Sequence, residues 1–145
     1  MERERRFLLR GVPEGVPDRI ANIVDRYLVG TRLRLRSVRW DDDREEWKLA
    51  RKLPHGPGGV VMGNLYLSAH EYALVATLPA HELRKRRLVF GSWLIDVFAN
   101  PHGLVLAEIE DDDPSSLANL VPPFPYEREV TGVANFEGAT LASKT

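Results

Sequence analysis

Glu2-Arg3-Glu4-Arg5-Arg6-Phe7, at residues 2–7, alternates acidic and basic side chains and ends on an aromatic residue. Successive side chains of an extended strand point to opposite faces, so Glu2, Glu4 and Arg6 would share one face. Two carboxylates on one face repel each other unless a metal ion or a cationic surface lies beside them. The stretch therefore predicts either a metal-binding strand or a solvated edge strand whose charges oppose aggregation.

The composition predicts one domain, residues 1–145, because 145 residues with 43% hydrophobic content are enough for one ordinary core. The formal net charge is −1 although 28% of the residues are charged, so any charge effect must come from segregation. Cysteine is absent, which excludes disulfides, thiolate metal sites and cysteine nucleophiles. The charged N-terminus and the lack of a long apolar run predict a soluble, cytoplasmic protein without a membrane partner.

Period-two alternation between apolar and polar residues predicts most of the chain to be strand. Short turns join these segments, including Asp41 to Asp43 at a hairpin tip. About eight strands joined by hairpins imply an antiparallel sheet, and such sheets commonly close into a barrel. The predicted strands are residues 2–7, 27–28 with 31–38, 47–52, 60–67, 83–90, 92–98, 104–110 and 127–131.

Three short helices are predicted between the strands. Asp18 would cap the first, which carries apolar residues at helical spacing up to Val24, and Ser68 with Glu71 forms a capping box for the second. The third would follow the acidic residues 111–113. The predicted class is mainly β with short α (α+β), as a closed eight-stranded antiparallel barrel with helices packed outside.

Charged residues recur at alternate positions in five of the predicted strands. Leu35 and Ile109 separate two of these pairs, so the opposite face is apolar and the charged face would line a wet lumen. Lysine and arginine match phosphate oxygens, and Mg²⁺ prefers carboxylate together with phosphate, which indicates a polyanion carried with a divalent metal. The charged sets are Glu2/Glu4/Arg6, Arg34/Arg36, Lys48/Lys52, Lys85/Arg87 and Glu108/Glu110, with Asp96 alone on its strand.

The ordered series of these motifs resembles the CYTH domain, the triphosphate tunnel metalloenzymes. It includes Glu2-x-Glu4-x-Arg6, Lys85-x-Arg87 and Trp93-x-x-Asp96, and it covers nearly the whole chain. The resemblance implies an eight-stranded tunnel that binds triphosphate-containing compounds with Mg²⁺ or Mn²⁺. Most members of this family hydrolyse the terminal phosphate, and a few cyclise ATP.

The resemblance also assigns roles to the charged residues. It implies Glu4, Asp96 and Lys85 as catalytic residues, with Asp96 as a further carboxylate near the metals and Glu129 as a weaker candidate of the same type. The metal ligands would be Glu2, Glu4, Glu108 and Glu110. The phosphate-binding wall would be Arg6, Arg34, Arg36, Lys48, Lys52, Lys85 and Arg87.

This chain departs from the family pattern at three places. Arg6 stands where lysine is usual, Ala50 where threonine is frequent, and residues 64–66 contain no acid where many members have glutamates. The first departure exchanges a compact ammonium for a larger guanidinium fork.

The predicted activity is metal-dependent hydrolysis of the terminal phosphate of inorganic tripolyphosphate, a nucleoside triphosphate or thiamine triphosphate. Three alternatives stay open: a non-catalytic binder of polyphosphate or an organic phosphate, an adenylate cyclase of the same family, and a nucleic-acid module that uses the arginines of residues 32–39. Carboxylates on the same faces argue against the last, because they repel a phosphate backbone. The expected partner is a small triphosphate compound, not nucleic acid, and a homodimer is left open.

Overall fold

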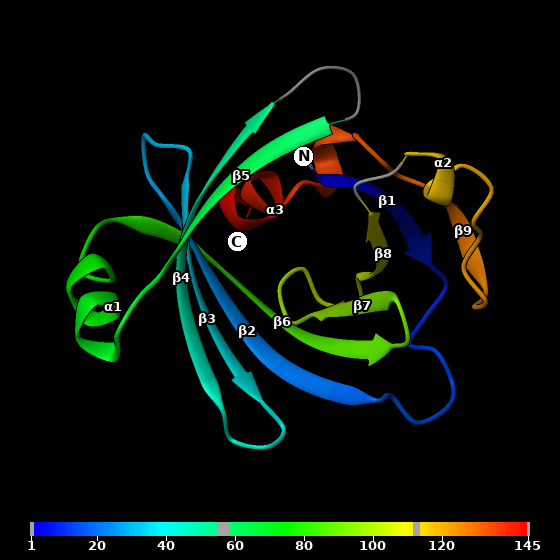
Figure 1. The fold of residues 1–145 in the computed structure, drawn as a ribbon, viewed down its shortest axis with the longest axis horizontal. Helices are drawn as coiled ribbons and strands as arrows, with labels where there is room; N and C mark the ends of the chain where they lie inside the picture. The colour runs from blue at the N-terminus through cyan, green and yellow to red at the C-terminus, as the bar shows by residue number, and fades with distance from the viewer. Residues whose placement is uncertain (1, 55–58, 112–113, 145) are drawn as a thin grey trace.

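The computed structural model describes residues 2–54, 59–111 and 114–144, and within them it contains one antiparallel sheet of nine strands with short helices (Figure 1). This confirms the predicted mainly-β class. The strands are β1 (Glu2–Leu9), β2 (Arg19–Leu28), β3 (Leu33–Trp40), β4 (Glu45–Pro54), β5 (Gly59–Tyr66), β6 (Ala80–Phe90), β7 (Trp93–Phe98), β8 (Val105–Asp111) and β9 (Tyr126–Glu129). The helices are α1 (Ala69–Val75), α2 (Pro114–Leu117), the 3-10 helix η1 (Ala134–Phe136) and α3 (Gly138–Ser143).

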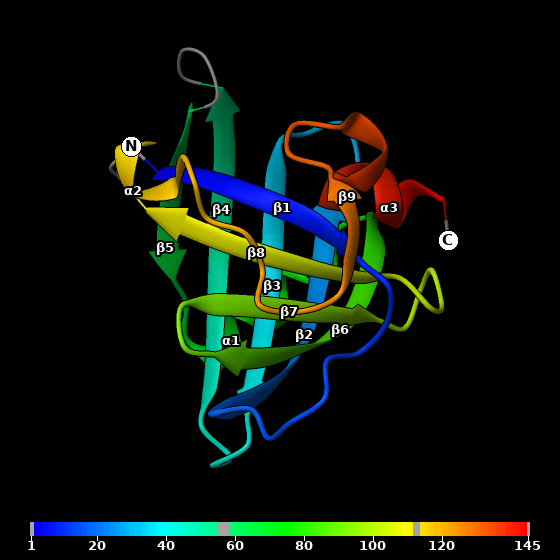
Figure 2. The same ribbon diagram turned by 90° about the vertical axis from the view of Figure 1, so that its right-hand side faces the viewer.

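The strand order is β5-β4-β3-β2-β6-β7-β8-β1-β9. The sheet bends, so that β1, β7 and β8 cross in front of β2, β3 and β4 when the molecule is turned (Figure 2). β1 also pairs with β5, at Glu2 with Val60 and Arg3 with Gly59. In the described residues the end strand β5 joins the other side of the sheet only at these two pairs with β1, so the closed eight-stranded barrel is not confirmed.

The structure has one strand more than predicted, because the segment predicted as a helix over residues 18–24 forms part of a strand. The predicted helix is therefore wrong. This segment belongs to β2, which pairs with both β3 and β6. Ala21, Ile23 and Asp25 are buried at every second position, which is the period of a strand. The apolar triad Ile20, Ile23 and Val24 matched a helical spacing as well, and pairing on both sides decided the outcome.

The outer face of the sheet carries the main apolar core. Phe7, Trp93 and Ile109 lie in it, and Leu117 of α2 packs over them.

The predicted capping box of α1 is confirmed, because Ser68 accepts a hydrogen bond from the Glu71 backbone and the Glu71 carboxylate accepts one from the Ser68 backbone. The helix ends at Val75, one turn before the predicted stop at Pro79. The predicted outer position of helices therefore holds for α2, and α1 contacts the outward-facing Trp47 through Tyr72.

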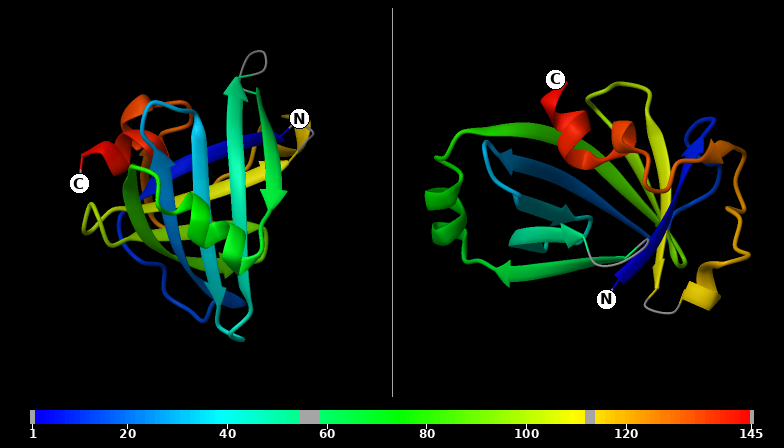
Figure 3. Two further views of the ribbon diagram at one scale, coloured as in Figure 1. Left: turned by 90° about the vertical axis from the view of Figure 1, so that its left-hand side faces the viewer. Right: turned by 90° about the horizontal axis from the view of Figure 1, so that it is seen from above.

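The C-terminal helix α3 packs on the other, inner face of the sheet, contrary to the prediction that helices lie outside. Its buried residues Leu141 and Ala142 contact Leu83, Phe98 and Leu106, which alternate along their strands with outer-face positions. Figure 3 shows η1 and α3 beside the concave side of the sheet. One end of the inner face is therefore filled by the chain's own C-terminal segment.

Close packing fixes the position of α3. Gly138, its first residue, lies so near the Tyr27 ring that a β-carbon there would overlap the phenol oxygen. Burial of Tyr27 and the neighbouring Asp25 carboxylate raise the pKa of this phenol to about 12.

None of the helices in the described ranges is long and apolar enough to cross a bilayer.

Candidate metal and phosphate site

Three carboxylates meet on the inner face where β1 runs antiparallel to β8. The register places Glu4 opposite Glu110 and Arg6 opposite Glu108. One carboxylate oxygen each of Glu4, Glu108 and Glu110 lies within 4.8 Å of the other two. Hard divalent cations such as Mg²⁺ and Mn²⁺ take oxygen ligands of this kind, so this acidic cluster has the donor chemistry for one.

Cations next to the acidic cluster lower the pKa of one of its members, Glu108. Burial alone would raise the pKa of Glu108, but the guanidiniums of Arg87 and Arg6 outweigh this effect and hold it below its ordinary value. Arg6 is itself buried, with its Nε 4.0 Å from a Glu108 oxygen. Its Nη1 donates a 2.6 Å hydrogen bond to the Phe136 carbonyl and lies 3.9 Å from a Glu137 oxygen. Arg6, predicted to bind phosphate, therefore also holds the C-terminal segment, a contact with no signal in the sequence.

A second cluster of charges joins β6 to β7. Arg87 donates two hydrogen bonds to the Asp96 carboxylate, at 2.8 and 3.0 Å, and the Lys85 ammonium lies 3.0 Å from the same carboxylate. Burial opposes ionisation of Asp96, but these two cations hold its pKa well below the ordinary value. Asp96 was predicted to act beside the metals, yet it lies outside the acidic cluster and orients two cations.

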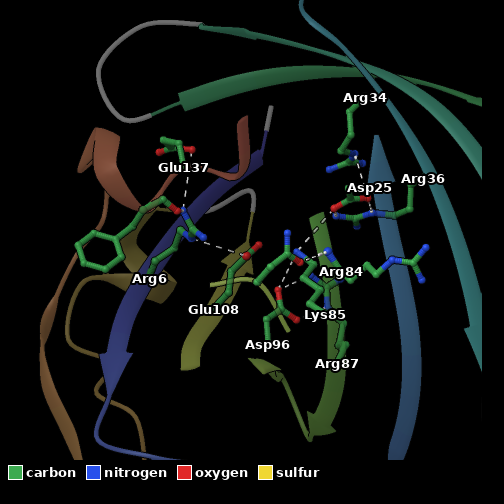
Figure 4. Close-up of polar contacts among 12 residues, drawn as sticks. Arg6, Asp25, Arg34, Arg36, Arg84, Lys85, Arg87, Asp96, Glu108 and Glu137 are labelled. Carbon is green, nitrogen blue, oxygen red and sulfur yellow. Dashed lines mark hydrogen bonds and ion pairs between the residues drawn. The ribbon is translucent and has the colours of Figure 1, made fainter. Parts of the chain in front are cut away.

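The third cluster contains a residue that the sequence analysis missed, Asp25. The Arg36 guanidinium donates to both of its carboxylate oxygens, at 2.7 and 2.9 Å (Figure 4). Lys85 lies 3.8 Å and Arg34 3.9 Å from the same carboxylate. Asp25 is fully buried, and despite that burial the three cations hold its pKa well below the ordinary value.

The basic residues of β3 and β4 complete the site. Arg36 pairs in register with Lys48, and burial lowers the pKa of Lys48 together with the charges of Arg36 and Arg34. Burial likewise lowers the pKa of Arg34, whose Nε has no hydrogen-bond partner among the described residues. Donors that are desolvated and incompletely satisfied favour an anionic ligand.

Most of the predicted site residues thus lie in one inner-face network, while two candidates are not described and one lies elsewhere. The side chains of Glu2 and Lys52 lie outside the described part of the structure. Glu129 was a wrong candidate, because it pairs with Arg5 at 2.8 Å on the opposite face of β1. The inner charged cluster, as we call the network, consists of Glu4, Arg6, Asp25, Arg34, Arg36, Lys48, Lys85, Arg87, Asp96, Glu108 and Glu110.

The inner charged cluster is nearly neutral as a whole. Six cations stand against five carboxylates, a formal excess of one positive charge. Its charges are nevertheless separated, because Glu4, Glu108 and Glu110 gather at β1 and β8 while Arg34, Arg36 and Lys48 gather at β3 and β4. Bare phosphate would gain little from the net charge alone, and a divalent cation at the acidic end would add to the attraction.

Comparisons with known proteins place the fold beside a small set of solved structures. Two structures of one protein, described as hypothetical protein NE1496 and as inorganic triphosphatase NE1496, align with TM-scores of 0.64 and 0.61 at 18% and 17% identity. They cover 98% and 97% of this chain, and 97% and 96% of their own. A conserved hypothetical protein from Pyrococcus furiosus aligns with a TM-score of 0.51 at 13% identity over 80% of this chain and 83% of its own.

Sequence comparison adds no assignment. No protein family and no curated protein matches this chain. At these identities the solved structures establish a shared fold.

Proposed function

We propose that this protein is a divalent-metal-dependent hydrolase that removes the terminal phosphate of a triphosphate compound inside a basic tunnel of the CYTH type. The observation that carries the proposal is the joining of a three-carboxylate cluster to a buried set of guanidiniums and ammoniums on one concave face. The inorganic triphosphatase among the structures of the same fold supports this choice over other phosphate chemistry. Tripolyphosphate, nucleoside triphosphates and thiamine triphosphate are the candidate substrates.

Each end of the inner charged cluster has its own part in this proposal. Glu4, Glu108 and Glu110, with Glu2 on the same strand as Glu4, would hold Mg²⁺ or Mn²⁺. A bound metal of this kind supplies charge neutralisation at phosphate oxygens and activation of a water molecule. Arg34, Arg36 and Lys48 would bind the phosphate chain, with Lys52 as a further cation of β4.

The cations between these two ends would bind the reacting phosphate group. Lys85 and Arg87 are fixed by Asp96 before the substrate arrives, so they need no reorganisation as negative charge develops. Asp96 would thus support catalysis by holding these donors. Arg6 would contribute positive charge beside Glu108 while it anchors the C-terminal segment.

The test measures phosphate release from the candidate substrates with Mg²⁺ or Mn²⁺, for the wild type and for Glu4→Gln. We expect activity with at least one substrate and a loss of at least a hundredfold in the variant, because the metal loses a charged ligand. Glu127→Gln, an exposed acid on β9, is the matched control and should keep full activity. Undiminished hydrolysis by Glu4→Gln would refute the assignment, and analysis of the ATP product separates hydrolysis from cyclisation.

One observation favours a second function, binding without turnover. Asn64 on β5 stands in register with Ala50, so the strand lacks an acid where the family resemblance expects glutamate. Tight, metal-dependent binding of tripolyphosphate with no phosphate release over many hours would select this alternative.

A further inference from the structure

Asp25 is the buried acid for which the proposed reaction gives no role. It is fully buried, and its carboxylate contacts Arg36 through two hydrogen bonds and lies within 4 Å of Arg34 and Lys85. It is not part of the acidic cluster that fits a metal ion. Three cations that would receive phosphate are therefore already in contact with one negative charge.

Lys85 links this carboxylate to the rest of the network. Its ammonium lies 3.0 Å from Asp96 and 3.8 Å from Asp25, so it bridges the two acids (Figure 4). The two acids are not equivalent, because Asp96 belongs to the pair with Arg87 whereas Asp25 lies among the cations of β3. A phosphate group held by Arg34 and Arg36 would consequently lie next to the charge of Asp25.

We propose that Asp25 is a positioning residue that acts as a fixed internal counter-anion: it orients Arg36 and weakens the hold of the basic wall on polyphosphate, so that phosphate products leave. The inference rests on the proposed function, because it concerns release from that same site. A unit charge within a few ångströms of the bound phosphate, in a partly desolvated site, changes anion affinity by about tenfold or more. Without this charge, the cations would retain both substrate and product.

The test is Asp25→Asn, which keeps the size of the side chain and removes its charge. Binding of pyrophosphate and tripolyphosphate is measured by calorimetry in EDTA, so that no metal takes part. We expect the variant to bind both anions at least about tenfold more tightly than the wild type. In the metal-loaded assay KM and kcat should fall together, because product release becomes slow. Unchanged or weaker anion binding by the folded variant would overturn the proposal.

Two further variants separate charge from shape and position. Asp42→Asn makes the same change of net charge at a half-exposed turn residue paired with Arg19, and should leave anion binding unchanged. Asp25→Glu keeps the charge on a longer side chain, so its affinity for polyphosphate in EDTA should stay within about threefold of the wild type. Its kcat should fall, because the longer side chain displaces Arg36. A tenfold change of affinity in the glutamate variant would contradict the proposal.

A second measurement applies if Asp25→Asn fails to fold without a ligand because its cations have lost their counter-anion. The proposal then requires that tripolyphosphate restore folding, because the added anion supplies the missing charge; failure to do so counts against it. If the wild type neither binds nor hydrolyses tripolyphosphate with Mg²⁺ or Mn²⁺ present, the proposed function itself has failed. If the wild type binds and hydrolyses tripolyphosphate while Asp25→Asn changes neither affinity nor kcat, only the role of Asp25 is wrong.

Discussion

At the scale of single residues, Asp96 shows what a buried acid contributes when it serves two cations. Its side chain is almost fully buried, and Arg87 and Lys85 both depend on it. Asp96→Asn leaves these charges without their partner, so we expect the free energy of unfolding to fall by about 3–5 kcal/mol. Urea denaturation at pH 7 measures the difference. Asp42→Asn, at an exposed pair, should cost no more than about 1 kcal/mol, and equal losses in the two variants would contradict the prediction.

The same carboxylate makes stability depend on acid pH. Arg87 and Lys85 hold the pKa of Asp96 below the value of about 3.9 expected in the unfolded chain. The stabilisation is therefore present above that pH and is lost as the pH falls below it, because the unfolded chain then binds the proton first. Between pH 4 and pH 2 the free energy of unfolding of Asp96→Asn should decline less steeply than that of the wild type, by up to about 1.4 kcal/mol per pH unit. Parallel curves from denaturation at several pH values would refute this.

At the scale of elements, the docking of α3 depends on one glycine. A β-carbon at Gly138 would overlap the Tyr27 phenol, which is held beneath the helix on β2. We expect Gly138→Ala to lower the free energy of unfolding by about 1–3 kcal/mol, the usual cost of overpacking. Gly11→Ala is the matched control, because a β-carbon there meets no atom within 4 Å. Similar thermal denaturation of the two variants would show that α3 does not need this close approach.

Element prediction succeeded where local chemistry decided the structure. The capping box at Ser68 and Glu71 needs only neighbours in sequence, and the hairpin at residues 41–43 needs only a turn, in which Asp43 adopts a φ of 65°. The prediction for β2 was wrong because the apolar residues of this segment fit both the helical and the strand period. Its strand conformation follows from pairing with β3 and β6, which lie far apart in sequence. The alternation of Ala21, Ile23, Asp25 and Tyr27 was the available signal. Read as a strand, it would have shown Asp25 as an acid on a buried face.

At the scale of the whole molecule, the alternate charges predicted which residues share a face, but not which of them touch. Glu4, Glu108 and Glu110 come together as expected, since one register between β1 and β8 aligns both acidic pairs. The partners of the cations were not predicted: Arg36 binds Asp25, which lies directly opposite it on the neighbouring strand β2, and Arg6 binds a segment 130 residues away. The inner-face position of α3 likewise depends on tertiary packing that the mixed C-terminal sequence does not reveal.

The near-neutral inner charged cluster predicts that polyphosphate binding depends strongly on metal. Without a divalent cation, Glu4, Glu108 and Glu110 repel the phosphate chain; with one, the acidic end becomes attractive. At a tripolyphosphate concentration of 100 times its Kd in Mg²⁺, binding adds about 2.7 kcal/mol to the stability, which raises Tm by several degrees in a domain of this size. In EDTA at the same concentration the rise in Tm should be less than half as large, and in Mg²⁺ Glu110→Gln should show a smaller rise than the wild type. Differential scanning calorimetry measures these shifts, and an equal rise with and without metal would show that the cations alone bind the ligand.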